Sequence, residues 1–420
     1  MRPASDPRRE FLLSMLESGL AAVNGRRRTR AALAGRHDLD GAWILAVGKA
    51  AGAMTLGAID ALGSKVERAL VVSREDHLEV ALMRDPRVTC LAGGHPVADA
   101  RSLEAGAAAL RFAGEARAGQ PLLMLVSGGA SSLLEALPAG VSPGDLQRLS
   151  EWALSCGESI GRINAVRRRL SRVKDGRLLA RLAHCRVEGY YLSDVPGDDP
   201  SVIGSGLLAR AQGRLDVAGL PGWLAVLLAQ HGEEAGPVPE VPLRCVGCLD
   251  DALDAIESAA STAGVDARRI AGRLEGPAAV AAQSAVTLLA DGPPGLRIQG
   301  GETTVVLAPG PGRGGRNQHL ALTAATMIAG RSDLLVMAVG TDGTDGNTGD
   351  AGALVDGGTL DRGRDAGLDA VDCLARADSG TFLEASGDLV HIGPTGTNVC
   401  DVLLMLRCEE GHSPRPAPSM

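Results

Sequence analysis

The first candidate for chemistry in this sequence is a turn that carries a lysine. Gly48 and Lys49 directly follow the apolar run 42–47 and precede a stretch rich in alanine and glycine. Backbone N–H groups at a turn that opens a helix attract anions, and an ammonium group on the same turn adds charge toward a phosphate. No G-x-x-x-x-G-K-[S/T] segment occurs, so the turn is not a Walker A loop. The alternative is a surface lysine, which a helix N-terminus slightly disfavours; we favour phosphate binding.

A second turn combines hydroxyl groups with glycine. Ser127, Gly128 and Gly129 follow the apolar run 122–126 and lead into two further serines. Hydroxyl and backbone N–H groups at a helix N-terminus together form a site for an anion. The alternative is an ordinary serine cap with a glycine turn. Two adjacent glycines exceed what a cap requires, so we predict that this turn also contacts the ligand.

Further polar side chains could reach the same ligand from two other places. His95 follows a pair of glycines, where its imidazole could contact substrate or hydrogen-bond within the turn, and the spacing favours neither. Asn164, Arg167 and Lys174 belong to a basic run. Arg167 and Lys174 are seven residues apart and would share one face of a continuous helix. We interpret most of the run as solvated surface and these two cations as ligands of an anion.

Carboxylates that suit a divalent cation occur in two loops. Asp194 and Asp198 lie at and beyond the end of one predicted strand, and Asp342 and Asp345 follow another. Mg²⁺ is bound by one or two carboxylates together with water and phosphate oxygens. Asp194 could also accept the proton of an attacking hydroxyl group, although aspartates are common in turns. We predict Asp194 as a catalytic residue and all four aspartates as candidate metal ligands.

A glycine-rich loop in the second half suggests a competing chemistry. Gly310, Gly312 and Gly315 match the G-x-G-x-x-G pattern of dinucleotide-binding proteins, which would favour an oxidoreductase. That pattern requires an acidic residue about 20 positions on, whereas Asp342 lies 27 positions after Gly315. The loop also contains arginines, including Arg316, that suit phosphoryl or carboxylate oxygens. We interpret the match as coincidental and predict that Arg316 binds an anion.

Composition restricts the class of protein. The 420 residues include 45% hydrophobic and 22% charged residues, which is typical of a soluble enzyme with more than one domain. A net charge of −8 argues against nucleic-acid binding. No apolar run is long enough to cross a membrane and the N-terminus does not resemble a secretory signal, so we expect a cytoplasmic protein. Its eight cysteines fit reduced thiols, and we interpret the one close pair, Cys245 and Cys248, as structural.

Short apolar segments alternate with amphipathic ones, which predicts an α/β fold with parallel strands. We expect one domain over residues 1–235, a second over 236–410, a polar linker near 232–242 and a disordered tail over 411–420. The predicted strands are 42–47, 69–73, 88–92, 122–126, 187–193, 243–247, 303–307 and 334–339, with further candidates near 388–391 and 402–406. The main predicted helices are 98–117, 144–159 and a long one that ends near 265.

Several of these motifs together resemble the glycerate 2-kinase family, whose C-terminal part is known as the MOFRL module. The resemblance extends from about residue 40 to 405 with the motifs in family order. They are GGHPVADARSLEAG, LVSGGASSLL, INAVRRRLSRVKDGRLLA, LSDVPGDDPSVIGSG, GGETTVVL, GRGGRNQHLAL, GTDGTDGNTGDAGALVD and GPTGTNVCD.

The resemblance implies an N-terminal Rossmann-like parallel sheet with flanking helices, a C-terminal mixed α/β domain, and an active site in the cleft between them. It implies ATP and Mg²⁺ as cofactors and transfer of a phosphoryl group to the 2-hydroxyl of D-glycerate. Lys49 and Arg316 match the catalytic residues proposed for the family. The motifs also imply contacts to substrate or nucleotide from Glu302, Gly315, Asn317, Gln318, Thr395 and Asn398.

Two other functions stay open. Some family members are named hydroxypyruvate reductase, a reaction that would require NAD(P)H. The motifs also depart from the usual family pattern, with SGGASSL for SGGGSAL, VRRRLS for VRKHLS, GSGLLA for an ASGPT-like segment and Ala377-Asp378-Ser379 for an NDS-like one. These departures leave the acceptor open and admit a catalytically silent anion-binding homologue. The oligomeric state is also open, with a homodimer as one alternative.

Overall fold

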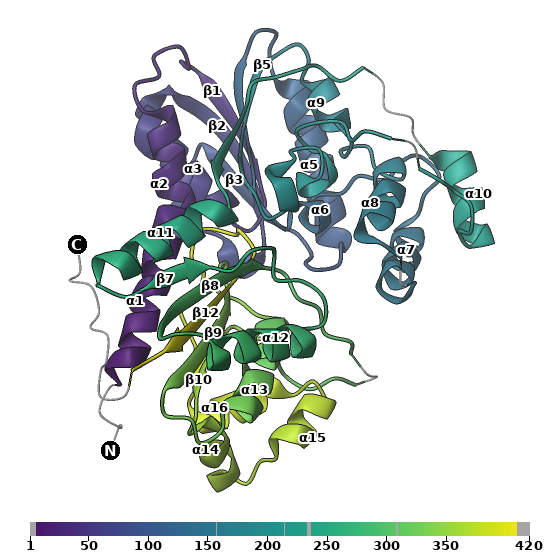
Figure 1. The fold of residues 1–420 in the computed structure, drawn as a ribbon. Coiled ribbons are helices and arrows are strands. Elements are labelled where there is room, and N and C mark those ends of the chain that lie inside the picture. Colours follow the sequence, from purple (N-terminus) through teal and green to yellow (C-terminus); the bar gives the residue numbers. More distant parts are fainter. Residues whose placement is uncertain (1–5, 157, 214, 233–236, 308–309, 410–420) are drawn as a thin grey trace. The chain divides into compact units, whose positions relative to one another are not determined.

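The computed structural model describes residues 6–156, 158–213, 215–232, 237–307 and 310–409. The chain forms two compact units, each built from segments that are distant in sequence. Unit 2 consists of Asn24–Cys248 together with the short segment Gly396–Asn398. Unit 1 consists of Met1–Val23, Leu249–Thr395 and Val399–Met420. Both units are α/β in architecture (Figure 1).

Unit 2 contains a six-stranded sheet in which every strand pair is parallel. In spatial order the strands are β3 Val88–Ala92, β2 Val66–Ser73, β1 Ala42–Val47, β4 Pro121–Val126, β5 Arg186–Leu192 and β6 Leu243–Gly247. All six residues of β1 are buried, because helices cover both faces of the sheet. The predicted Rossmann-like parallel sheet is confirmed.

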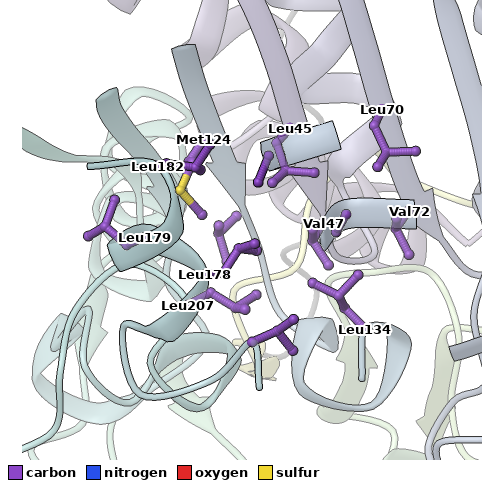
Figure 2. Close-up of a cluster of buried hydrophobic side chains, with 14 of the residues drawn as sticks. Leu45, Val47, Leu70, Val72, Met124, Leu134, Leu178, Leu179, Leu182 and Leu207 are labelled. Atoms are coloured by element: carbon purple, nitrogen blue, oxygen red, sulfur yellow. The ribbon is translucent and has the colours of Figure 1, made fainter. Parts of the chain in front are cut away.

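The helices of unit 2 lie on both sides of this sheet, with α2 and α3 on one face and α5 and α9 on the other (Figure 1). Figure 2 shows the second face, where Leu45 and Val47 of β1 and Met124 of β4 meet Leu178 of α9 and Leu182, the residue after that helix. The α-helices are α2 Gly25–Leu33, α3 Ala51–Leu62, α4 Val80–Met83, α5 Ala100–Glu115, α6 Ala130–Leu133, α7 Pro143–Ser155, α8 Ile160–Arg169, α9 Arg177–Arg181 and α10 Gly222–His231. The described residues of this unit also form short 3₁₀ helices at Gly63–Lys65, Glu75–His77, Pro196–Asp198 and Ile203–Ser205.

Unit 1 contains a mixed sheet, in agreement with the predicted C-terminal domain. In spatial order its strands are β11 Leu389–Val390, β10 Gly352–Asp356, β9 Leu334–Gly340, β12 Asp401–Arg407, β8 Gly295–Gly301 and β7 Ala267–Arg269. β12 runs antiparallel to both β8 and β9. Its helices are α1 Pro7–Ala22, α11 Leu249–Thr262, α12 Ala278–Asp291, α13 Arg316–Ile328, α14 Thr359–Asp365, α15 Ala370–Ala375 and α16 Ser379–Ser386.

Alternate residues of β9 supply two different cores in unit 1, as the two-residue period of a strand requires. Leu334 and Val336 pack with α12, α13 and α16, whereas Leu335 and Met337 pack with α1 and α11. Among the described residues, no helix has both the length and the apolar composition that a membrane span requires.

Helix α1 explains why the compact units differ from the predicted domains. Its residues Phe11, Leu12 and Met15 are fully buried in the core that α11 shares, so the first helix belongs to unit 1 rather than to the N-terminal domain. The chain passes from unit 2 to unit 1 after Cys248 rather than after residue 235. Part of the predicted linker and the whole predicted tail lie outside the described residues.

The predicted strand 303–307 is wrong. Residues 303–307 form only one isolated bridge, at Thr304, and Val306 is 91% exposed. The sheet instead contains β8, whose Leu296 and Ile298 are fully buried. Consecutive β-branched residues suggested a strand, but strand formation requires a neighbouring strand and a buried face, which only β8 has.

Candidate active site

The candidate ligand site of unit 2 lies at the carboxyl ends of its two central strands. The strand order β3-β2-β1-β4-β5-β6 reverses direction between β1 and β4. In open α/β sheets, ligands bind at such a switch point because the adjacent loops separate there. Gly48 and Lys49 follow β1, and Ser127 follows β4, with Val47 and Val126 paired as the last residues of the two strands. The structure therefore brings the two predicted anion-binding turns together.

Hydrogen bonds fix the backbone of both turns. The Lys49 N–H donates to the Gly128 carbonyl at 2.9 Å, and the Ala50 N–H donates to the Ser127 hydroxyl at 3.0 Å. Gly48 has a φ of 129°, and a Cβ atom there would lie 2.2 Å from the Ser127 hydroxyl oxygen. Only glycine allows this approach. The lysine is thus presented from a rigid support that does not use its side chain.

Asp194 and Asn398 lie against Gly128, the first glycine of the serine and glycine turn. A Cβ atom at Gly128 would lie 2.1 Å from Asp194 Oδ2 and 1.9 Å from Asn398 Nδ2. The Asn398 amide donates to Asp194 Oδ2 at 3.4 Å. Asn398 reaches this place because Gly396–Asn398 belongs to unit 2, where the Gly25 N–H donates to the Gly396 carbonyl at 2.9 Å.

His95 lies against Gly129, the second glycine of the same turn. A Cβ atom at Gly129 would lie 3.2 Å from both His95 Cδ2 and Lys49 Cγ, so both side chains contact this glycine. His95 also lines a cavity of about 380 Å³ beyond the ends of β2 and β3. Its other lining residues are Arg74, Glu75, Asp76, Gly93 and Arg101. The histidine therefore connects the lysine turn to a cavity with room for a small ligand.

Lys174 and Arg167 do not share a helix face as predicted, because α8 ends at Arg169 and Lys174 lies in the following turn. Lys174 is 1% exposed and forms an ion pair with Glu135, a buried residue that the sequence analysis did not identify. Burial lowers the pKa of Lys174, and the adjacent Glu135 carboxylate opposes that effect. Burial likewise lowers the pKa of Arg167, which also interacts with Glu135. We interpret this group as structural.

Asn164 lies at one end of a chain of hydroxyl groups. The Ser205 hydroxyl is 2.7 Å from the Ser131 hydroxyl and donates to Asn164 Oδ1 at 3.5 Å. Ser131 belongs to α6, which the serine and glycine turn opens. Asn164 thus supports the turn through two serines.

We expect Lys174→Met to destabilise unit 2 by about 3 kcal/mol, because it leaves the Glu135 carboxylate buried without a partner. The three tryptophans, at positions 43, 152 and 223, all belong to unit 2, so their fluorescence during urea unfolding follows this unit. Adding the substitution Glu135→Leu to this variant should restore much of the lost free energy of unfolding. Lys65→Met, which breaks an exposed pair, is the control. Unchanged stability with a raised KM would instead make Lys174 a ligand of the substrate.

Cys245 and Cys248 lie where β6 ends, next to the loop that carries Asp198. The Asp198 carbonyl accepts a hydrogen bond from the Tyr191 hydroxyl at 3.2 Å. A hydrogen bond between the two thiols that favours the protonated Cys245, together with burial, raises the pKa of Cys245 far above its ordinary value. A thiol with a raised pKa is a poor nucleophile. This supports the structural interpretation of the pair.

We therefore expect the double variant Cys245→Ser, Cys248→Ser to keep kcat and KM within a few-fold of the wild type. Both enzymes are assayed with and without a thiol reductant. Activity that depends on reductant in the wild type and not in the double variant would show that the pair has a redox function.

The candidate site of unit 1 lies at the N-terminus of α13, where a carboxylate is already bound. Asp345 is 3% exposed, and its oxygens accept the Asn317 N–H at 3.2 Å and the Gln318 N–H at 2.8 Å. Burial raises the pKa of Asp345 to about 7, although these hydrogen bonds oppose it. A Cβ atom at Gly315 would lie 2.3 Å from Asp345 Cγ. Asp345 thus occupies the position where a dinucleotide would place its pyrophosphate.

Arg316, the first residue of α13, is bound by two carboxylates. Its Nε and Nη2 atoms donate to the two oxygens of Asp401, and Nη2 also donates to Glu302. Burial disfavours the charge of Arg316, but Asp401 and Glu302 outweigh this effect and raise its pKa further. Asp401 was not among the predicted site residues, although it ends the GPTGTNVCD motif. An acidic residue at the start of an apolar strand is the signal that could have identified it.

The remaining predicted residues shape the loops of unit 1. Asp342 Oδ1 accepts from the Thr344 N–H at 2.8 Å and from its hydroxyl at 3.1 Å. The Thr395 hydroxyl donates to the Thr341 carbonyl at 2.5 Å. Within the described ranges, no three His, Cys, Asp or Glu side chains are grouped so that they could hold a metal ion. These contacts favour a structural role for Asp342 and Asp345.

A parallel sheet with a lysine and glycine turn at its switch point, joined to a mixed α/β unit with a paired arginine, is typical of a two-domain enzyme that binds phosphorylated ligands. The chain belongs to the glycerate 2-kinase family. Residues 11–218 match a family described only as a domain of unknown function (DUF4147), and residues 295–401 match the MOFRL family.

The relatives support this assignment over nearly the whole chain. The D-glycerate 2-kinase of Thermotoga maritima is 34% identical over 95% of this chain and 98% of its own. The crystal structure of a glycerate kinase from Thermotoga maritima has a TM-score of 0.80 at 32% identity, and covers 95% of this chain and 99% of that one. A protein of Agrobacterium vitis, 35% identical over 86% of this chain and 98% of its own, is provisionally named hydroxypyruvate reductase.

Proposed function

We propose that the protein is an ATP-dependent kinase that phosphorylates the 2-hydroxyl of D-glycerate and releases 2-phosphoglycerate and ADP. The observation that carries this proposal is the pair of turns at the switch point of unit 2, which presents Lys49 beside Ser127–Gly129. The family assignment supplies the substrate. All eight cysteines, each of them described, are free thiols, which supports a reducing compartment such as the cytoplasm.

Phosphoryl transfer requires charge compensation and alignment more than covalent chemistry. We propose that Lys49 compensates the negative charge that develops on the transferred phosphoryl group. Backbone groups of the Ser127–Gly129 turn would bind the anionic ligand beside it. Arg316 of unit 1 would contribute a positive charge to a phosphoryl or carboxylate group of a ligand. Because the Lys49 turn is fixed by backbone hydrogen bonds, little reorganisation is needed when the ligand binds.

Asp194 is the carboxylate that we propose to act on the acceptor. It ends up against Gly128, where the absence of a Cβ atom leaves room for its side chain. One carboxylate oxygen can orient the 2-hydroxyl group of glycerate and accept its proton. The Asn398 amide, which donates to Asp194 Oδ2, would keep the carboxylate in this orientation.

The residues of this site also suit a Mg²⁺ ion that accompanies ATP. Mg²⁺ needs only one or two protein carboxylates when phosphate oxygens and water complete its shell, so a cluster of three is not required. Asp198 of the same loop would hold the ion, and Asp194 would hold it as the alternative to orienting the hydroxyl group. When bound, the ion neutralises charge on the β- and γ-phosphates.

Reduction of hydroxypyruvate is less well supported. The sheet order of unit 2 is also found in dinucleotide-binding proteins. However, the Ala50 N–H at the first turn already donates to Ser127, and Asp345 occupies the N-terminus of α13 after the G-x-G-x-x-G loop. The N-terminus of α13 thus holds a carboxylate where a pyrophosphate would bind, and the Ala50 N–H of the first turn is already used.

The test measures both reactions on one preparation. The protein is incubated with D-glycerate and Mg-ATP while ADP release is followed, and with hydroxypyruvate and NADPH while NADPH is followed. ³¹P NMR identifies whether the product carries phosphate at C2 or C3, and an assay in excess EDTA tests the metal. We expect ADP release with a C2 phosphate. NADPH consumption without ADP release would establish the reductase. The absence of both signals would support a silent homologue.

A further inference from the structure

The two carboxylates that bind Arg316 differ sharply in burial. The Asp401 side chain is 2% exposed, whereas the Glu302 side chain is 52% exposed. Asp401 belongs to β12 and pairs with Gly301 of β8 and Gly340 of β9, so glycines flank it on both neighbouring strands. A Cβ atom at Gly340 would lie 3.5 Å from Asp401 Oδ1. The sheet itself therefore fixes Asp401, while Glu302 follows the end of β8 at the surface.

The carboxylates also use different edges of the guanidinium group. Asp401 accepts from Nε and from Nη2, the latter at 3.0 Å, and so occupies the side edge with both oxygens. Glu302 accepts from Nη2 with one oxygen, and Nη1 donates to no described residue. A guanidinium group has a second edge, formed by Nη1 and Nη2, that can bind two oxygens of a carboxylate or phosphate in parallel. Glu302 covers this end edge incompletely.

The local charge favours an exchange of partners. Asp401, Glu302 and Asp345 all interact with the single positive charge of Arg316. An exposed ion pair is weak because water and salt screen it, whereas a buried carboxylate that lost its partner would be left uncompensated. An arriving anion would therefore displace Glu302 at little cost and leave the Asp401 pair intact.

We propose that Asp401 is the positioning residue of Arg316 and that Glu302 is an exchangeable partner, displaced when a phosphoryl or carboxylate group binds the end edge of the guanidinium. This inference rests on the proposed function for the identity of the ligand. Asp401 keeps the guanidinium plane aligned for that ligand, and Glu302 competes with the ligand for Arg316.

The test compares Asp401→Asn with Glu302→Gln. In Asp401→Asn one oxygen becomes a donor that cannot accept from Nε, so Arg316 loses its alignment. We expect kcat to fall by about 100-fold, the cost of a displaced catalytic group, with a much smaller change in KM. In Glu302→Gln we expect KM for the anionic substrate to fall by up to about fivefold, the strength of an exposed pair. Glu384→Gln, which removes an exposed partner from the neighbouring Arg313, is the matched control.

A second measurement does not depend on kinase activity and separates failure of this inference from failure of the proposed function. Phenylglyoxal reacts with the two terminal nitrogens of arginine, and peptide mass spectrometry gives its rate at Arg316. Glu302→Gln should make Arg316 react faster and should let inorganic phosphate protect it at lower concentration. If Glu302→Gln and Asp401→Asn lose kcat equally, or if Glu302→Gln changes neither the rate nor the protection, the proposed exchange is wrong. Because Glu302 is exposed, this variant decides the matter even if Asp401→Asn does not fold.

Discussion

Lys49→Ala is expected to lower kcat by about 1,000-fold or more, which corresponds to about 4 kcal/mol of transition-state stabilisation. The substitution removes the charge that we propose to act on the transferred phosphoryl group. It leaves the turn intact, because the Lys49 N–H donates to Gly128 and the Ala50 N–H donates to Ser127 whatever the side chain at position 49. The measurement is kcat and KM for D-glycerate and Mg-ATP, with tryptophan fluorescence as the check on unit 2.

Lys65→Ala is the control for this experiment, since it removes a partly exposed lysine of the same unit that is paired with Asp40. It should leave kcat and KM close to those of the wild type. A Lys49→Ala enzyme with near-normal turnover would remove Lys49 from the mechanism. A raised KM with unchanged kcat would restrict its role to binding of the ground state.

The centre of the parallel sheet was predictable because β1 and β4 are apolar on both faces. The run AWILAV is β1 at the predicted bounds, and all of its residues are buried. Such continuous apolar runs between helical segments define a parallel strand without knowledge of its neighbours. β8, with the sequence GLRIQGG, has glycine at both ends and polar residues within, so its identity depends on β12 beside it. A local pattern does not contain that information.

Site residues were predicted where a local sequence pattern identifies them, and were missed where their role depends on residues distant in the sequence. Lys49 and Ser127 occupy turns that follow strands, and the general rule for ligand sites in α/β sheets places them together. Asp401 matters only because the strand register sets it beside Arg316, 85 residues away in the sequence. Lys174 was predicted to bind an anion together with Arg167 because of their spacing. However, α8 ends between the two residues, and the buried Lys174 forms an ion pair with Glu135 instead.

The glycines of the loop before α13 show that a motif can be matched for unrelated reasons. A Cβ atom at Gly312 would lie 2.4 Å from Cβ of Asp378, and one at Gly315 would lie 2.3 Å from Cγ of Asp345. Asp378 in turn accepts the Arg313 N–H at 2.9 Å. These glycines allow protein side chains to approach the loop, and no dinucleotide is needed to explain them. Gly312→Ala would disturb this packing under either chemistry and therefore cannot distinguish a kinase from a reductase.

Arg316 does distinguish them, and its replacement should have the other large effect. We expect Arg316→Ala to lower kcat/KM by about 1,000-fold, the scale of an arginine that stabilises a transferring phosphoryl group. Arg316→Lys keeps the positive charge but cannot bind Asp401 through two nitrogens and still present a second edge to the ligand. We expect it to lose about 1–3 kcal/mol of transition-state stabilisation. Both variants are measured in the glycerate kinase assay after circular dichroism has confirmed their folding.

The comparison of the two variants carries more information than either value. If only charge matters, Arg316→Lys should resemble the wild type and Arg316→Ala should not. If the planar group aligned by Asp401 matters, both should be impaired, with the lysine variant between the wild type and the alanine variant. In a reductase this residue would bind at most a carboxylate or phosphate in the ground state, because hydride transfer develops no charge on a phosphoryl group, so its loss would raise KM rather than lower kcat. Benign effects of both substitutions would therefore remove Arg316 from the active site and, with it, the main support that unit 1 gives to the kinase.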